Sequence, residues 1–135
     1  MRPALFVAFA LLATGCLSIS TPLEPNAPLG SPFELKVGQS AVVPGGLTVR
    51  FDAVLSDSRC PIDAICVQAG EARIAMTLSV SPRDRVQREW RTNPTGFEVR
   101  FDDFAIQLGE LHPYPASSAP TAPGDYVATL TVTRR

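Results

Sequence analysis

Few residues of this chain have side chains that could perform chemistry. His112 is its single histidine and therefore the only side chain that titrates near neutral pH without a perturbed pKa. Cys16, Cys60 and Cys66 offer thiols for nucleophilic attack, metal binding or disulfide formation. One histidine removes most His-based metal sites, and no serine lies in a Gly-x-Ser-x-Gly or Ser-x-x-Lys motif. We therefore expect no catalytic group, no metal and no cofactor, and a surface position for His112.

The charge of the chain is balanced, with 12 basic and 13 acidic residues and a net charge of −1. This balance argues against a nucleic-acid partner, which requires a positive field. The one local concentration of positive charge consists of Arg83, Arg85, Arg88 and Arg91, beside Asp84 and Glu89. Strand alternation would put Arg85 and Arg91 on one side with Glu89, and Arg88 on the other with Val86 and Trp90. The segment is either a solvated hairpin that discourages edge-to-edge pairing or a contact for anionic headgroups, lipopolysaccharide phosphate or an acidic partner.

The elements that must position these side chains are strands. From Phe33 onward, apolar and polar residues alternate in stripes at 47–53, 72–80, 97–101, 104–108 and 126–132, with shorter candidates at 33–37, 40–43 and 86–92. Turn-forming residues separate them, and no stretch after residue 16 has the period of a long amphipathic helix. The pattern predicts an all-β domain over residues 33–135, an antiparallel β-sandwich of seven or eight strands resembling the immunoglobulin fold. A small β-barrel is the alternative, and the proline-rich segment Leu111–Gly124 is expected to be a long surface loop.

The N-terminus has the pattern of an export signal. Met1 and Arg2 precede an apolar run from Ala4 to Ala13, which as a helix would rise only about 15 Å and is too short to span a bilayer. The run ends in Leu-Ala-Thr-Gly-Cys at 12–16, which resembles the lipobox of bacterial lipoproteins. An ordinary cleaved signal that happens to contain a cysteine is the alternative.

The lipobox resemblance implies a signal peptide at residues 1–15 and a mature chain that begins at lipidated Cys16. Diacylglyceryl and further acyl chains such as palmitate would then anchor the protein stably in a membrane. Leu17 follows the cysteine, whereas aspartate there marks inner-membrane retention in that family, so the resemblance implies the outer membrane. Residues 16–32 would form a proline-rich tether, whose part 21–32 spans about 37 Å as polyproline II.

With Cys16 assigned to lipid, Cys60 and Cys66 remain as a pair in an oxidising compartment. We expect them to form a disulfide that closes a short loop and stiffens its own neighbourhood. A metal or redox site and a catalytic nucleophile are the alternatives, and both would need further groups beside the thiols.

The segment from Asp57 to Ala72 carries a second resemblance. An Asp-Ser-Arg-Cys-Pro turn at 57–61, a cysteine at 66 and Ala-Gly-Glu-Ala at 69–72 are similar to a group of small bacterial secreted proteins and lipoproteins that has no established activity. Gln68 stands where that group has tryptophan. Gly70 is expected to supply either a backbone conformation or a close approach that a side chain would forbid. Arg59 is either an exposed contact residue or, as we favour, a salt-bridge partner of Asp57 or Glu71.

These observations together predict a non-enzymatic, lipid-anchored lipoprotein of the cell envelope. Its body would be a binding module for an unknown ligand, with an envelope protein as a possible partner. The alternative is an inhibitor of a periplasmic or extracellular hydrolase that presents the Arg59–Cys66 loop, with Arg59 or the Pro113–Pro115 turn as the probe. A hydrolase that uses His112 is the third interpretation.

Overall fold

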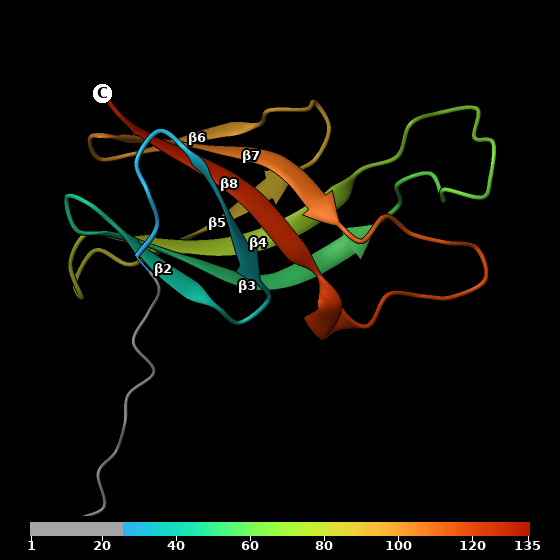
Figure 1. Ribbon diagram of the computed structural model, residues 1–135, viewed down its shortest axis with the longest axis horizontal. Coiled ribbons are helices and arrows are strands. Elements are labelled where there is room, and N and C mark those ends of the chain that lie inside the picture. Colours follow the sequence, from blue (N-terminus) through green and yellow to red (C-terminus); the bar gives the residue numbers. More distant parts are fainter. Residues whose placement is uncertain (1–25) are drawn as a thin grey trace, which may run out of the picture.

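The computed structural model describes residues 26–135, so the predicted signal peptide and Cys16 lie outside the described residues. The described chain forms eight strands in two four-stranded antiparallel sheets, together with one short 3-10 helix (Figure 1). The elements are β1 (Pro32–Lys36), β2 (Ser40–Val43), β3 (Leu47–Asp57), β4 (Ala72–Ser79), β5 (Val86–Arg91), β6 (Glu98–Phe101), β7 (Phe104–His112), η1 (Pro123–Asp125) and β8 (Val127–Arg134).

One sheet has the strand order β2-β3-β4-β5 and the other the order β1-β8-β7-β6. Hydrogen-bonded neighbours are consecutive in the chain, except that β1 pairs with β8. The sheets are not closed into a barrel, so the predicted antiparallel sandwich is confirmed and the barrel alternative is wrong. In the described residues, no helix is long and apolar enough to cross a bilayer.

The apolar residues of the alternating stripes form the core between the two sheets. In β3, Leu47, Val49 and Phe51 are fully buried, whereas Arg50 between them is exposed. Trp90 of β5, Phe104 of β7 and Tyr126 before β8 are the other large aromatic side chains in this core. The burial of these stripes supplies the hydrophobic stabilisation of the domain.

The pairing of β3 and of β7 with their neighbours contains register shifts. The register of β3 against β4 shifts between Phe51 and Ala53 and again between Val54 and Ser56. The register of β7 against β8 shifts between Leu108 and Leu111, and β7 continues to His112. Bulges of this kind increase strand twist and turn side chains in new directions. His112 is therefore the last residue of a strand, where the sequence analysis expected a loop.

The folded domain begins before residue 33, where the strand pattern predicted its start, because residues from Asn26 onward already contact the sandwich. The amide of Ala27 donates to the carbonyl of Val42 at 2.9 Å, and the amide of Gly30 donates to that of Val132 at 2.7 Å. Ala27 is buried, and β1 begins at Pro32. The prolines of this segment do not prevent pairing, because the residues between them supply the N–H donors. Residues 26–32 of the predicted tether therefore belong to the folded domain.

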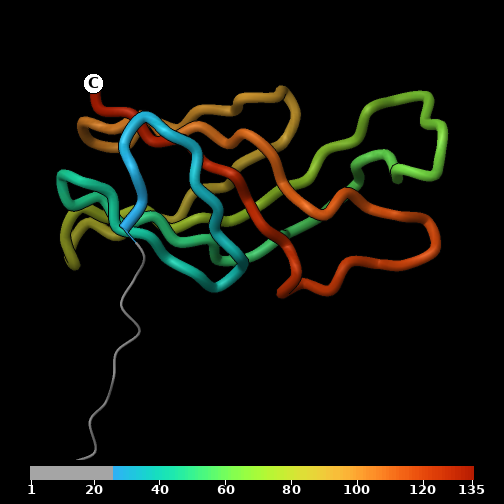
Figure 2. The backbone as a smooth tube through the Cα atoms, viewed as in Figure 1, coloured from blue at the N-terminus to red at the C-terminus, as the bar shows by residue number. Residues whose placement is uncertain are grey.

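Two loops lie together at the end of the sandwich where β3 and β7 finish. They are residues 58–71 and 113–125, and both extend from the same end of the molecule in Figures 1 and 2. Asn26 pairs with Val42, near the start of β3, and therefore lies towards the opposite end. We call the end that carries the two loops the distal end.

Candidate functional site

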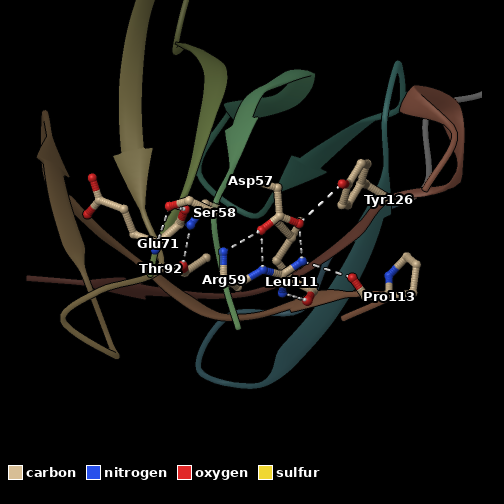
Figure 3. Close-up of polar contacts among 9 residues, drawn as sticks. Asp57, Ser58, Arg59, Glu71, Thr92, Leu111, Pro113 and Tyr126 are labelled. Atoms are coloured by element: carbon tan, nitrogen blue, oxygen red, sulfur yellow. Dashed lines mark hydrogen bonds and ion pairs between the residues drawn. The ribbon is translucent and has the colours of Figure 1, made fainter. Parts of the chain in front are cut away.

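An ion pair between Asp57 and Arg59 lies at the centre of the distal end (Figure 3). Arg59 Nη2 is 2.6 Å from Asp57 Oδ2, and Arg59 Nε is 2.8 Å from Asp57 Oδ1. The geometry is the two-pronged pairing that the planar guanidinium favours. The side chains of Arg59 and Asp57 are only 7% and 8% exposed, so the pair is largely shielded from water.

The remaining donors of Arg59 hold the end of β7 and the start of the second loop. Nη1 donates to the carbonyl of Leu111, and Nη2 donates to the carbonyl of Pro113 at 2.8 Å. The guanidinium carbon also lies 4.7 Å from the centre of the Tyr114 ring, a cation–π distance. One side chain therefore joins loop 58–71 to loop 113–125.

The predicted salt bridge between Arg59 and Asp57 is confirmed, and the alternative that Arg59 is an exposed contact residue is wrong. The residue is 8% exposed, because its charge is used to connect two loops that are distant in the sequence. An Arg59 probe would have to break these contacts and leave a buried carboxylate without its partner.

The Asp57 carboxylate remains ionised because of its partners. Burial alone would raise its pKa, but the hydrogen bonds from the Arg59 side chain and amide, with the arginine charge, outweigh burial and lower the pKa below 3.8. The hydroxyl of Tyr126 also donates to Asp57 Oδ2, at 3.1 Å. Burial, followed by the Asp57 charge, raises the pKa of Tyr126, so the phenol remains a donor.

The start and the end of loop 58–71 are joined beside this pair. Ser58 Oγ and the Ser58 amide both donate to the carbonyl of Glu71, each at 2.9 Å (Figure 3). A Cβ atom on Gly70 would overlap the carbonyl oxygen of Ser58. Of the two alternatives for Gly70, the close approach is the one that the structure shows, and the neighbouring atoms belong to the backbone of Ser58 and Arg59.

The disulfide between Cys60 and Cys66 is formed, with a Cα–Cα distance of 5.9 Å, as predicted. The loop that it closes is also fastened to the second loop. The amide of Ile62 donates to the carbonyl of Pro115 at 3.0 Å, and the amide of Ser117 donates to Asp63 Oδ1 at 2.8 Å. The bond from Ser117 lowers the pKa of Asp63.

This fastened loop presents aliphatic side chains to solvent. Ile65 and Val67 are fully exposed, at 102% and 103%, and Ile62 is 74% exposed. We call these three residues the apolar tip. The tip could not be predicted from local pattern, because scattered apolar residues in a short segment are as consistent with a buried turn as with an exposed loop. The available signal was apolar residues between and directly after the two cysteines, at 62, 65 and 67, that follow neither a period of two nor one of 3.6.

A small cavity of about 340 Å³ lies beside the ion pair. It is lined by Arg59, Cys60, Ala69, Gly70, Thr92, Asn93, Thr95, Gly109, Glu110, Leu111 and Tyr114. His112 does not line it; its Nε2 lies 2.7 Å from Glu110 Oε2 on the exposed surface, and its ring meets Tyr114 edge-on. Among the described residues, no hydroxyl or thiol is hydrogen-bonded to His112, and no cluster of His, Cys, Asp and Glu could hold a metal.

The three other candidate contact residues, Arg85, Arg88 and Arg91, do not line the cavity beside the Asp57–Arg59 ion pair. The predicted alternation is confirmed, because Arg91 lies 3.9 Å from Glu89 on one side of β5, while Trp90 on the other side is in the core. Arg91 is also 3.9 Å from Glu71, so its charge is compensated. Arg88 is exposed opposite Met76, and Arg85 lines a groove on the outer face of its sheet.

Comparisons with known proteins add no assignment, because no family model, no curated protein and no solved structure matches the chain. The interpretation of the site therefore rests on its geometry.

Proposed function

We propose that the chain is a lipid-anchored lipoprotein of the cell envelope whose body binds a protein partner through the apolar tip, without catalysing a reaction. The observation that carries this proposal is the full exposure of Ile65 and Val67 on a loop held by a disulfide and by the second loop. Exposed aliphatic groups held in one place at a loop end are typical of interaction sites.

The restraint of the loop supports a role in binding. Association loses free energy when flexible side chains and loops become ordered. Here the order exists before binding, because the Cys60–Cys66 bond and the bond from Ile62 to Pro115 already hold the loop. Burial of the tip in an apolar cleft would then contribute almost its full hydrophobic free energy.

The position of the tip favours a protein over the membrane of the anchor itself. Asn26, the first described residue, lies beside the start of β3. The tip lies after the other end of that strand, which is eleven residues long. Eleven residues of strand extend about 36 Å. An anchor at Cys16 would therefore hold the opposite end of the domain near the membrane and direct the tip away from it.

The tip is tested with Ile65→Asp and a photo-crosslinking residue at Val67. The partner captured in intact envelopes is purified, and its affinity is measured directly for the wild-type chain and for the variant. We expect Ile65→Asp to weaken binding at least tenfold, because a charge would enter an apolar cleft. Leu55→Asp makes a similar change at an exposed strand position outside the loop and should leave the affinity unchanged. Equal affinities for wild type and Ile65→Asp would refute the role of the tip.

The anchor is tested separately by mass spectrometry and by metabolic labelling with a fatty-acid probe. The wild-type chain should carry lipid at Cys16, and Cys16→Ser should not be labelled. A water-soluble mature protein that starts at another residue would contradict the lipoprotein assignment.

A hydrolase inhibitor is the second candidate, because a disulfide-closed loop with a fully exposed Ile65 also suits insertion into an active-site cleft. Because Arg59 is buried, Ile65 is the residue that would enter the active-site cleft of the hydrolase. The full chain is tested against a panel of proteases and glycosidases. Inhibition by wild type that is lost in Ile65→Asp and retained in Leu55→Asp would support this function over a non-inhibitory module.

A further inference from the structure

The outer face of the sheet β2-β3-β4-β5 carries a groove of about 530 Å³. The volume is in the range of small-ligand sites. Most such sites are lined by apolar groups, whereas every side chain that lines this one is polar. Four of them bear hydroxyls, on Ser40, Thr48, Thr77 and Ser79. A ligand here must be held by hydrogen bonds and charge.

The register of the strands accounts for the hollow. Ser40, Arg50, Thr77 and Gln87 pair with one another in succession across all four strands. In the next row, Thr48 pairs with Ser79. Short side chains on the central strands therefore lie among the longer side chains of Arg50, Arg85 and Gln87, and the space between them stays open.

Asp52 organises these longer side chains. It lies at the register shift between Phe51 and Ala53, and its side chain is only 16% exposed. Its Oδ2 accepts hydrogen bonds from Thr77 at 2.6 Å and from Gln87 at 3.1 Å. Its Oδ1 lies 3.6 Å from Arg50 Nε. The carboxylate is thus occupied by groups of the protein and holds Arg50 and Gln87 in place.

The groove therefore has an excess of positive charge. Arg50 compensates Asp52 through Nε and still has its terminal Nη groups, while Arg85 forms no ion pair with any residue in the described part of the chain. Guanidinium groups donate strong, charge-assisted hydrogen bonds to phosphate oxygens, and hydroxyls add neutral donors beside them. A phosphate presents at least three acceptor oxygens, which suits donors from Arg50, Arg85 and the hydroxyls around them.

We propose that this groove is a binding site for the phosphate group of a small ligand, held by Arg50, Arg85 and the hydroxyls of Thr48 and Ser79. It is separate from the apolar tip, so one domain carries a phosphate site on a sheet face and a protein contact at its end.

The phosphate belongs either to a lipid headgroup or to a water-soluble phosphate compound. Asn26 pairs with Val42 of β2, the strand that borders the groove. Cys16 precedes Asn26 by ten positions, over which a fully extended chain spans about 35 Å at most. If Cys16 is lipidated, which is part of the proposed function, the groove is within reach of headgroups. The phosphate proposal itself does not depend on that anchor.

The test is a titration of the full chain, prepared as Cys16→Ser so that lipid insertion does not contribute. Inorganic phosphate and a short-chain phosphatidylglycerol below its micelle concentration are the probes, and amide chemical shifts are the readout. We expect saturable shifts confined to the strands around Thr48, Thr77 and Arg85. The substitutions Arg50→Gln and Arg85→Gln should each weaken binding at least tenfold. Arg83→Gln removes the same charge from the neighbouring turn, outside the lining, and should change the affinity less than twofold.

The outcomes separate the two sources. Tighter binding of phosphatidylglycerol than of inorganic phosphate supports the headgroup, and equal or weaker binding supports a soluble compound. The proposal is overturned if neither probe gives saturable shifts, or if Arg83→Gln weakens binding as much as Arg85→Gln does. Since all these chains lack Cys16, failure of the lipid anchor leaves the result unaffected.

Discussion

The guanidinium of Arg59 lies in a two-pronged contact with the carboxylate of Asp57, two residues earlier in the chain, at 2.6 and 2.8 Å. The same guanidinium donates to the carbonyl of Pro113, 54 residues later. A local turn contact and a long-range contact therefore share one charged group. Together with the bonds from Ile62 to Pro115 and from Ser117 to Asp63, this pair fixes the relative position of the two loops at the distal end, and the apolar tip depends on the loops.

Removal of the arginine should destabilise the domain strongly. Arg59→Ala leaves the Asp57 carboxylate buried without its partner, and we expect a loss of about 3–5 kcal/mol in the free energy of unfolding. Urea denaturation followed by the fluorescence of Trp90, the only tryptophan and a core residue, measures this loss. Arg100→Ala breaks the exposed pair with Glu98 and should cost about 1 kcal/mol or less. Similar losses in the two variants would contradict the central role of Arg59.

The Asp57 carboxylate should make the domain sensitive to acid. Because its pKa is lower in the folded state, the unfolded state takes up this proton first as the pH falls. The stabilisation is therefore complete well above about pH 4 and decreases as the pH falls through the folded-state pKa. Asp57→Asn should be less stable at neutral pH, with a shallower decline on acidification. Asp63 also has a lowered pKa, so part of the dependence of the free energy of unfolding on pH should persist in Asp57→Asn. The double variant with Asp63→Asn should lose that part as well. An unchanged slope in Asp57→Asn would refute this linkage.

Gly70 should not tolerate even the smallest side chain. The methyl group of Gly70→Ala would overlap the carbonyl oxygen of Ser58, so the two ends of loop 58–71 would have to separate. We expect a loss of about 3 kcal/mol, at the upper end of the usual cost of overpacking. Gly124→Ala is the matched control, since no atom lies within 4 Å of its Cβ position, and its effect should stay within about 0.5 kcal/mol. Thermal and urea unfolding compare the two variants.

The disulfide should act locally. Loss of a closed loop of seven residues corresponds to at most about 2.4 kcal/mol in the chain-entropy model. In the double variant Cys60→Ser and Cys66→Ser, we expect hydrogen exchange to accelerate in residues 60–70 and to change little in β3 and β4. The variant should also bind the partner of the tip more weakly, because the loop must then be ordered on binding. Faster exchange throughout the core would show that the bond supports the whole domain instead.

Much of the fold could be predicted from local pattern. The strand stripes, the turns between them and the two sides of the segment around Arg85 all follow from a period of two, which is a property of neighbouring residues. The pairing of Cys60 with Cys66 also needed only the count and spacing of cysteines. The end of β7 was less predictable, because His112 pairs with Val127, a partner outside any local window.

The sequence by itself thus determined an all-β sandwich with one short disulfide loop, and it indicated that Arg59 lies near the acidic residues Asp57 and Glu71. Only the tertiary structure decided that Arg59 is buried, that Ile65 and Val67 are exposed, and that Arg50 and Arg85 share a groove. The physical reason is that burial and charge pairing depend on which distant segments meet. Tyr126 and Asp57 are 69 residues apart and share a hydrogen bond that no local period encodes.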